Sequence, residues 1–520
     1  MKVESVIISF IFSILCKLQD AYEKSFTHSL LEGFASKFKN FLEYSLIWRF
    51  IRKKGKIAQS WENSYTLGLL NKLINLPSSL LRRVYIKYQK IFDASIFIRV
   101  LKFFVSKYTL ILGACLIITV IIPDSYWYNK YSVMMALVLV LLFLIKTILE
   151  DKQSFKIKTL ELPIFIFWLS VILGTVNSVI PRLSLSYLLL YVISAIFLIL
   201  IISSSSFFKE LNIMVDLLLV GVTFTALYGI YQWKFIGIPV NPSITDTRLN
   251  PGLSRISSTM GNENVYGELL VLTLPFFVTA IINAKTLIKR LVFSAMIIPV
   301  VIALFLTGSR SAWISFAVSI FVFVFLINRK LLPLAILAGA LAVPLLPDVI
   351  YRRIMTLFNP NENSLNYRSL IIRHVKPMLM DYWVSGVGLG INAFSSVFKR
   401  YLSFGLTSAV HTHNLYLQIW LEAGILSIAS FIWFLFRLFK NSVTRIFKHV
   451  GQSDAKNTLI AGVSALFGIL VMGLADHVWF YNRLMLMFWV VVGIILTCLN
   501  ILGKEGEYSE GSHPQTNESN

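Results

Sequence analysis

The sequence predicts an all-α polytopic membrane protein with about 12 transmembrane helices and one large extracytoplasmic loop between helices 9 and 10. Three observations lead to this class. Of the 520 residues, 56% are hydrophobic and 14% are charged, which is more apolar side chain than one soluble core of this length can bury. Apolar runs recur at close to the ~20 residues that a spanning helix needs. Lysine and arginine gather in the short segments between those runs.

The charge and the cysteines exclude other classes of protein. A net charge of +22 would suggest a nucleic-acid partner in a soluble protein, but here the basic residues lie in short loops and favour a role in membrane topology. Cys16, Cys115 and Cys498 are far apart in apolar surroundings, so they predict neither a metal site nor a disulfide framework. The first apolar stretch has no small-residue cleavage site after it, so we expect no cleaved signal peptide.

Residues 1–105 differ from the rest of the chain. The first hundred positions contain 16 Lys/Arg and 7 Asp/Glu, with aromatic residues spaced among them. This pattern favours basic amphipathic helices that lie on an anionic cytoplasmic leaflet. A loosely ordered tail is the alternative.

The segment 106–502 holds the predicted transmembrane domain, and a polar tail over 503–520 is expected to be disordered in the cytoplasm. Two of the predicted spans, 311–328 and 331–347, are separated only by Arg329 and Lys330. The twelve predicted spans are 106–123, 132–149, 160–180, 184–202, 211–235, 265–284, 290–307, 311–328, 331–347, 412–438, 457–477 and 482–502.

The loop charges predict the orientation, because Lys and Arg are retained on the cytoplasmic side. With the N-terminus inside, fourteen basic residues fall in short inner loops and four in short outer loops. We therefore expect an inner-membrane protein with both termini in the cytoplasm. Two longer outer segments remain, 236–264 and 348–411, and chemistry is expected there because sites are commonly built on loops that a rigid scaffold holds.

Four motifs follow one another along these outer segments. They are Arg255–Asn264, Thr307–Ala312, Arg368 through Asp381 to Gly386, Gly388 and Gly390, and His413-Asn414 followed by Glu422 and Gly424. Their order resembles the O-antigen ligase and O-antigen polymerase family, the lipid-linked glycan transferases of the bacterial cell envelope. The resemblance implies a GT-C-like bundle without a cofactor. It also implies transfer of a glycan from undecaprenyl pyrophosphate to an acceptor hydroxyl on the outer face.

Three arginines are candidates for binding the pyrophosphate of such a donor. A guanidinium stays charged and can hold phosphate through two hydrogen bonds. Arg310 stands in an outer loop of a few residues, against the positive-inside bias, which favours function over a snorkelling side chain. Arg255 and Arg368 are selected only by the resemblance, since Arg352, Arg353, Arg373 and Arg400 share the loop with Arg368.

The acceptor hydroxyl needs a base, and imidazole is suited to that role near neutral pH. His413 precedes Asn414 where the outer loop enters a span, and His411 is an alternative base or a hydrogen-bonding neighbour. Asn414, Gln418 and Glu422 share an arc of about 80° on one helix face, which should face the bundle interior. Glu422 either orients the site or ties helices together.

The remaining candidates are less specific. Asn264 is expected to bind substrate by resemblance, and Asp381 either caps the glycine turn at 386–390 or holds an arginine. The outer motifs contain no Asp-x-Asp, and Asp124 is the one acid between the first two spans, so metal-independent transfer is predicted. A direct attack by the acceptor hydroxyl would invert the anomeric centre, which the resemblance also implies.

The leading hypothesis is a ligase or polymerase whose acceptor is a lipid, glycan or protein. The alternative is a secondary transporter or flippase that uses the acids Asp216, Glu268 and Asp476 inside or beside the spans. A purely structural scaffold is the weaker third reading.

Overall fold

The computed structural model describes residues 24, 29, 33, 56–151, 153–205, 207–238, 254–345, 347–356, 363–402, 408–449, 451 and 453–510. Contacts divide the chain into two units, 1–63 and 64–520. The described part of the first unit includes one short helix, α4 (Lys56–Glu62). Within the predicted surface region 1–105, most of residues 1–55 lie outside the described residues, as do the last ten residues of the chain, 511–520.

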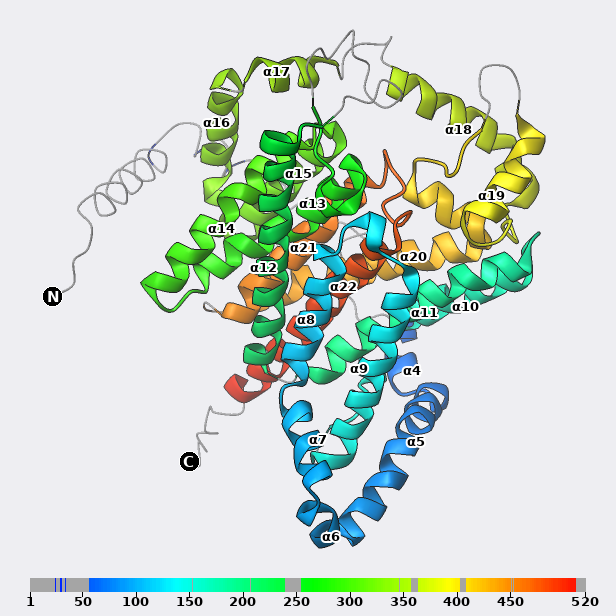
Figure 1. The fold of residues 1–520 in the computed structure, drawn as a ribbon, viewed down its shortest axis with the longest axis vertical. Helices are drawn as coiled ribbons and strands as arrows, with labels where there is room; N and C mark the ends of the chain where they lie inside the picture. The colour runs from blue at the N-terminus through cyan, green and yellow to red at the C-terminus, as the bar shows by residue number, and fades with distance from the viewer. Residues whose placement is uncertain are drawn as a thin grey trace, which may run out of the picture. The chain divides into compact units, whose positions relative to one another are not determined.

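The second unit is helical throughout its described residues, with no strand among them. Figure 1 shows its helices in chain order. They are α5 (Tyr65–Lys87), α6 (Gln89–Ala94), α7 (Ile96–Ser106), α8 (Tyr108–Ile121), α9 (Asn129–Leu149), α10 (Leu162–Val176), α11 (Pro181–Ser204), α12 (Phe208–Tyr231), α13 (Glu263–Ile282), α14 (Leu287–Leu306), α15 (Arg310–Asn328), α16 (Leu332–Ala342), α17 (Asp348–Met355), α18 (Asn363–Tyr382), α19 (Gly390–Phe398), α20 (Leu415–Lys448), α21 (Asp454–Met472) and α22 (Asn482–Glu510).

Long apolar helices confirm the predicted class, a polytopic all-α membrane protein. Within the described ranges, nine helices are long and apolar enough to span a membrane, or ten if the bent pair α7 and α8 counts as one span. The predicted count of twelve is not confirmed. Helix α10 has only 15 residues, and the stretch Arg310–Leu341 qualifies as a single candidate. Helix α22 continues to Glu510, so residues 503–510 of the predicted disordered tail are helical.

Contacts at the N-terminal end of α15 require the chain to turn back between α15 and α16. A straight helix over Arg310–Leu341 would carry the chain about 48 Å away from Arg310. Yet Arg310 donates to the Thr356 hydroxyl at 2.9 Å, and Arg353 on α17 donates to the Gly308 carbonyl at 3.2 Å. The few residues between Leu341 and Arg353, most of them helical, span less than about 30 Å. The turn therefore falls at the break near Asn328, whose backbone is extended.

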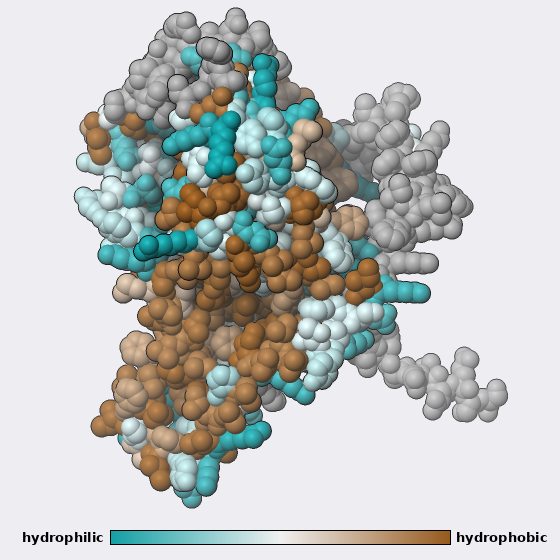
Figure 2. Space-filling view, turned by 90° about the vertical axis from the view of Figure 1, so that its right-hand side faces the viewer, coloured by the Kyte–Doolittle hydropathy of each residue, from teal (hydrophilic) through white to brown (hydrophobic). Residues whose placement is uncertain are grey.

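The core of the bundle is formed by helices that are apolar all round, as expected for buried spans. In the most apolar window of each helix, 89% of α22 and 83% of α13 is buried, whereas the figure for α14 is 22%. The poorly buried helices are therefore the ones that present apolar side chains outward. In Figure 2 hydrophobic side chains (brown) run together across the middle of the face that is drawn, and hydrophilic side chains (teal) gather above them.

The loops that carry the four motifs meet at one end of the bundle. Arg483 at the start of α22 donates to the Ile122 carbonyl at 2.7 Å, to Asp124 at 2.8 Å and to the Thr259 carbonyl at 3.1 Å. These bonds join the α8–α9 connection and the 254–262 segment to α22. Asp124, the acid considered for a metal site, is thus paired with an arginine.

Ion pairs join helices at the opposite end, where the basic residues of the predicted inner loops lie. Lys289 pairs with Asp216 at 2.8 Å, and Arg437 pairs with Glu161 at 2.6 Å. Lys289 lies about 27 Å along α14 from Thr307, so these pairs are remote from the motif loops.

Candidate active site

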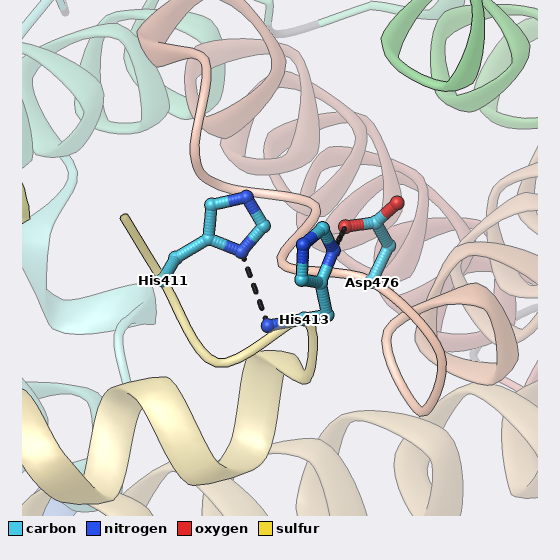
Figure 3. Close-up of side chains that lie close together, drawn as sticks. All are labelled: His411, His413 and Asp476. Carbon is cyan, nitrogen blue, oxygen red and sulfur yellow. Dashed lines mark hydrogen bonds and ion pairs between the residues drawn. The ribbon is translucent and has the colours of Figure 1, made fainter. Parts of the chain in front are cut away.

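The candidate site is built around Asp476, in the connection between α21 and α22. Its carboxylate lies beside His413, which ends the loop that leads into α20 (Figure 3). His413 has a φ of +49°, and Ser258 with +47° is the other non-glycine residue with a positive φ in the described ranges. Such backbone costs of order 1–3 kcal/mol and is concentrated at functional sites. Both residues lie in the predicted motifs.

The hydrogen bond between His413 and Asp476 determines which nitrogen of His413 can act as a base. Nδ1 of His413 lies 3.1 Å from Oδ1 of Asp476. An ionised carboxylate only accepts hydrogen bonds, so Nδ1 carries the proton and the lone pair remains on Nε2. Figure 3 shows the second ring nitrogen of His413 on the side away from Asp476. The arrangement is that of a general base oriented by a carboxylate.

His411 lies beside His413 but is held in the opposite tautomer. The backbone N–H of His413 donates to Nδ1 of His411 at 3.1 Å, so a neutral His411 carries its proton on Nε2. The ring centroids of the two histidines are 4.1 Å apart, and His411 also packs on Phe480 at 4.4 Å. Burial, assisted by the nearby His413, lowers the pKa of His411 to about 3. His411 is therefore a neutral donor, and the sequence alternative of His411 as the base is disfavoured.

Asp476 also binds the second functional group of the site, the guanidinium of Arg368 on α18. Nη2 of Arg368 lies 3.3 Å from Oδ2 of Asp476, and the Asn264 amide donates to the same oxygen at 3.4 Å. Burial by itself raises the pKa of Asp476, but the hydrogen bond from His413 and the charge of Arg368 hold this pKa well below its usual range. Asp476 is therefore a carboxylate that joins His413, the candidate base, to an arginine.

A second group of arginines surrounds the turn between α14 and α15. Arg255 donates to the Thr307 carbonyl at 2.8 Å and to the Asn264 side chain at 2.7 Å. Gly308 has a φ of +60°, and a Cβ there would lie 3.0 Å from Cγ of Arg255, so a larger residue would displace the arginine. Arg310, the first residue of α15, and Arg353 are also buried against this turn. Three guanidinium groups thus meet at one short loop.

Two of the predicted site residues, Asn414 and Asp381, have mainly structural contacts. Asn414 caps α20 by accepting from the Leu417 backbone at 2.9 Å and donates to the Leu474 carbonyl at 2.9 Å. Asp381 accepts from the Tyr401 hydroxyl at 2.5 Å and stands about 20 Å along α18 from Arg368. The structure therefore does not bring Asp381 to the cluster, whereas Asn414 ties the His413 loop to the Asp476 loop.

Glu422 ties helices together at the predicted glycine turn. It accepts from the Tyr191 hydroxyl at 3.2 Å, the Gly390 backbone at 3.2 Å and the Gln418 amide at 3.0 Å. Helix α20 is interrupted directly after it, at Ala423–Gly424. The turn fills this break, because the Val387 and Gly388 amides donate to the Leu421 and Glu422 carbonyls. Gly386, Gly388 and Gly390 all have a positive φ, as a tight turn of this kind requires.

Two residues of the site were not selected from the sequence. Asp476 was considered only as an ion carrier, although its position beside His477 at the outer end of a span was a usable signal. Arg353 was one of several arginines in the large loop, and only its burial against Gly308 distinguishes it.

His411, His413 and Asp476 also offer three ligand atoms within 4.8 Å of one another. The residues fit a divalent cation poorly. Nδ1 of His411 already accepts the His413 amide, and Oδ1 of Asp476 accepts from His413 and from the His477 amide at 2.9 Å. The other oxygen of Asp476 faces the Arg368 guanidinium, whose charge would repel a metal ion.

Comparison with known proteins gives one family. Residues 294–432 match the model of the O-antigen ligase family. This range contains Arg310, Arg368, His411 and His413, while Arg255 and Asp476 lie outside it and join them only through the fold. A search of the curated proteins finds no match to the chain. The resemblance inferred from the motifs is confirmed over this part of a multi-pass membrane protein, so residues 294–432 form a domain of the O-antigen ligase family.

Proposed function

We propose that this protein is a membrane glycosyltransferase that moves a glycan from undecaprenyl pyrophosphate to an acceptor hydroxyl on the outer face of the cytoplasmic membrane. The observation that carries the proposal is the bridge at Asp476. One carboxylate orients a histidine base and also holds an arginine, at 3.1 Å and 3.3 Å. A transferase of this type needs a base for the acceptor and cations for the leaving pyrophosphate, and both types of group meet here.

The proposed step is a direct displacement. The acceptor hydroxyl gives its proton to Nε2 of His413 while its oxygen attacks the anomeric carbon. The bond from that carbon to the phosphate oxygen breaks, and its electron pair leaves with undecaprenyl pyrophosphate. Attack from the face opposite the leaving group inverts the anomeric centre. Asp476 stabilises the imidazolium that forms, as a carboxylate does in other oriented histidine bases.

The arginines meet the charge that develops on the pyrophosphate. Arg368 stands beside the base, and Arg255, Arg310 and Arg353 surround the turn at Gly308. Guanidinium groups that are fixed before the reaction stabilise developing charge more than mobile water does. No cofactor or metal ion has a part in this scheme, in which the charge of a divalent cation is replaced by these arginines.

The proposal is tested by glycan transfer from purified undecaprenyl-pyrophosphate donor in the presence of EDTA. We expect His413→Gln to lower transfer at least 10²-fold, the lower range for general-base catalysis, and Arg310→Lys to lower it by a similar factor. The matched controls are His449→Gln and Arg437→Lys at the opposite end of the bundle, both expected to keep native rates. Equal transfer by His413→Gln and native protein would show that the base is wrongly assigned. The size distribution of the product separates a ligase from a polymerase.

A transporter or flippase is supported less well. Two of its three candidate ion carriers are engaged in other contacts, because Asp216 pairs with Lys289 at 2.8 Å and Asp476 binds His413 and Arg368. The third, Glu268, is buried on α13. The interruption of α20 resembles the broken helices of transporters, but backbone groups of the glycine turn fill it.

We propose further that both termini are cytoplasmic and that α5–α7 lie on the inner leaflet. Helices α5 and α7 expose apolar side chains such as Leu80, Ile96 and Phe103, next to basic residues such as Arg83 and Arg99. This combination suits the interface of an anionic bilayer.

A further inference from the structure

Helix α10 is too short to cross a membrane by itself. Its 15 residues, Leu162–Val176, rise about 22 Å, whereas the hydrocarbon core of a bilayer is about 30 Å thick. The helix begins directly after Glu161, whose carboxylate pairs with Arg437 of α20 at 2.6 Å. Because an ion pair belongs at or outside the edge of the hydrocarbon core, α10 ends inside the leaflet that is next to the candidate active site.

Helix α20 is interrupted at the depth where α10 ends. Its break is at Ala423–Gly424, and Gly424 precedes Arg437 by 13 positions, or about 20 Å. Gly174 of α10 follows Glu161 by the same number of positions, and a Cβ added to Gly174 would lie 2.8 Å from Cα of Ala423. The two helices therefore run side by side from the ion pair to the break. The break lies roughly 10 Å or more below the far edge of the hydrocarbon core.

The loop between α17 and α20 reaches the same depth. The Trp383 carbonyl accepts from the Ile425 amide at 2.8 Å, just past the break. The glycine turn at 386–390 is bonded to the break, as described above, and the Val179 amide of the α10–α11 connection donates to the Val387 carbonyl at 3.1 Å. Helix α18 also contacts α20, and α19 contacts α11 and α20 (Figure 1). The end of α18 and the glycine turn thus occupy the depth that α10 does not span.

The outward face of α18 changes from polar to apolar toward this end. Four exposed side chains share an arc of about 60° on the helix, and in order toward the turn they are Ser369, Arg373, Lys376 and Met380. The exposed fractions of Met380, Trp383 and Val384 are 69%, 51% and 58%. The acid at this end, Asp381, lies about 100° around the helix from Met380 and accepts from the Tyr401 hydroxyl.

Basic residues followed by large apolar side chains suit the boundary of a lipid leaflet. Arg373 and Lys376 precede Met380 by about 6–10 Å along α18, a spacing at which they reach lipid phosphates while the end of the helix contacts acyl chains. The exposed Val176 and Val179 at the end of α10 continue the apolar surface onto the spanning helices, which lipid covers. Depth and charge therefore both favour lipid as the occupant of this surface.

We propose that the segment from Met380 to Gly388 is re-entrant and lies among the acyl chains of the leaflet beside the candidate active site, with Arg373 and Lys376 at the lipid phosphates. The proposal goes beyond the proposed function and does not depend on glycan transfer. It has a consequence for the site, because Arg368 precedes Arg373 by about 8 Å on the same helix. Insertion of the end of α18 thus holds Arg368 at the membrane surface.

Spin labels test the surroundings of each position directly. Met380→Cys and Val384→Cys are labelled in the full-length protein, in liposomes of phosphatidylethanolamine and phosphatidylglycerol. Ser369→Cys, on the same face of α18, is the matched control. Cys115 and Cys498 are buried, and the native chain treated with the same label gives the background. Oxygen dissolves among acyl chains, whereas the nickel chelate NiEDDA stays in water, so collisions of each reagent with the label distinguish lipid from water.

Collisions at positions 380 and 384 should be more frequent with oxygen than with the nickel chelate, and the order should be reversed at position 369. Frequent collisions with the nickel chelate at 380 and 384 would place the segment in water and overturn the proposal. Rare collisions with both reagents would show that protein covers the segment, for example a second copy of the chain, and would overturn it as well.

A second measurement needs no label. Brominated lipid quenches the fluorescence of tryptophan that touches acyl chains, so Trp383→Phe should lose part of the quenched fluorescence of the native chain. Trp479→Phe is the matched control, because Trp479 is only 3% exposed, and it should keep the quenched fluorescence of the native chain. Equal quenched fluorescence in the native chain and Trp383→Phe would contradict lipid contact at the end of α18.

Discussion

Replacing Asp476 with asparagine tests the bridge that defines the site. The change keeps the size of the side chain and removes its charge. Because an amide can donate as well as accept, His413 is no longer obliged to carry its proton on Nδ1, and the lone pair can leave Nε2. Arg368, only 18% exposed, loses its carboxylate partner at the same time. A single substitution therefore disturbs both the base and one of the cations.

The expected loss is large. In the Ser-His-Asp triad the same substitution lowers turnover about 10⁴-fold because the histidine adopts the wrong tautomer. Asp476 makes the equivalent contact at 3.1 Å, so we expect a loss of between about 10³-fold and 10⁴-fold, or roughly 4–5 kcal/mol of transition-state stabilisation.

The assay is the initial rate of glycan transfer by purified protein, with the melting temperature in detergent as the test of folding. The matched control is Asp216→Asn, which also removes a carboxylate from an ion pair, the one with Lys289 at 2.8 Å. It lies far from the motif loops and should leave the rate within threefold of native. If Asp476→Asn folds and keeps more than a tenth of the native rate, Asp476 does not orient the base and the reasoning from its geometry is wrong.

Three further predictions concern the surroundings of the bridge. Arg255 donates to both the Thr307 carbonyl and the Asn264 side chain, and a lysine lacks the forked geometry that reaches both. Arg255→Lys should therefore lower kcat/KM for transfer about 10- to 100-fold, and a native value would exclude Arg255 from the site. The pKa of His411 is depressed by burial to about 3, so its neutral form stabilises the fold fully above its unfolded pKa of ~6.5 and this contribution is lost as pH falls toward 3. His411→Asn should make the fall of the melting temperature between pH 6.5 and 4.5 less steep, with the rest of the fall due to His477, whose pKa burial also lowers, and an unchanged slope would contradict this. Gly388→Ala places a methyl group on a backbone with φ +107° and against the side chain of Ser178, so it should lower the melting temperature by several degrees. Gly339→Ala, which meets no atom within 4 Å, should not.

The fold class followed from local features of the sequence. Apolar runs of spanning length and basic loops are properties of neighbouring residues, so α9, α11 and α14 appear where the sequence predicts them. The number of spans did not follow from these local features, because it depends on where the helices are interrupted. Whether α15 and α16 form one helix is decided by contacts of Arg310 and Arg353 with residues far along the chain.

The site was predicted only in part, because it also depends on contacts between residues that are far apart along the chain. His413, Arg255 and Arg368 could be named by resemblance, and the structure brings them together with Asn264. Asp381 shared a motif with Arg368 but stands elsewhere on the same helix, because a helix separates residues in proportion to their spacing. Asp476 was passed over as part of the site since its partners lie far away along the chain.

The sequence by itself determined that this chain belongs in a membrane and which motifs its loops carry, because hydropathy and charge act through short segments. Only the tertiary structure decided which histidine has its lone pair on Nε2, which arginines are buried at the Gly308 turn, and that Asp476 joins them. Those choices depend on hydrogen bonds between residues such as Asn264 and Asp476, 212 positions apart, and a hydrogen bond forms only when packing brings its two atoms within about 3 Å.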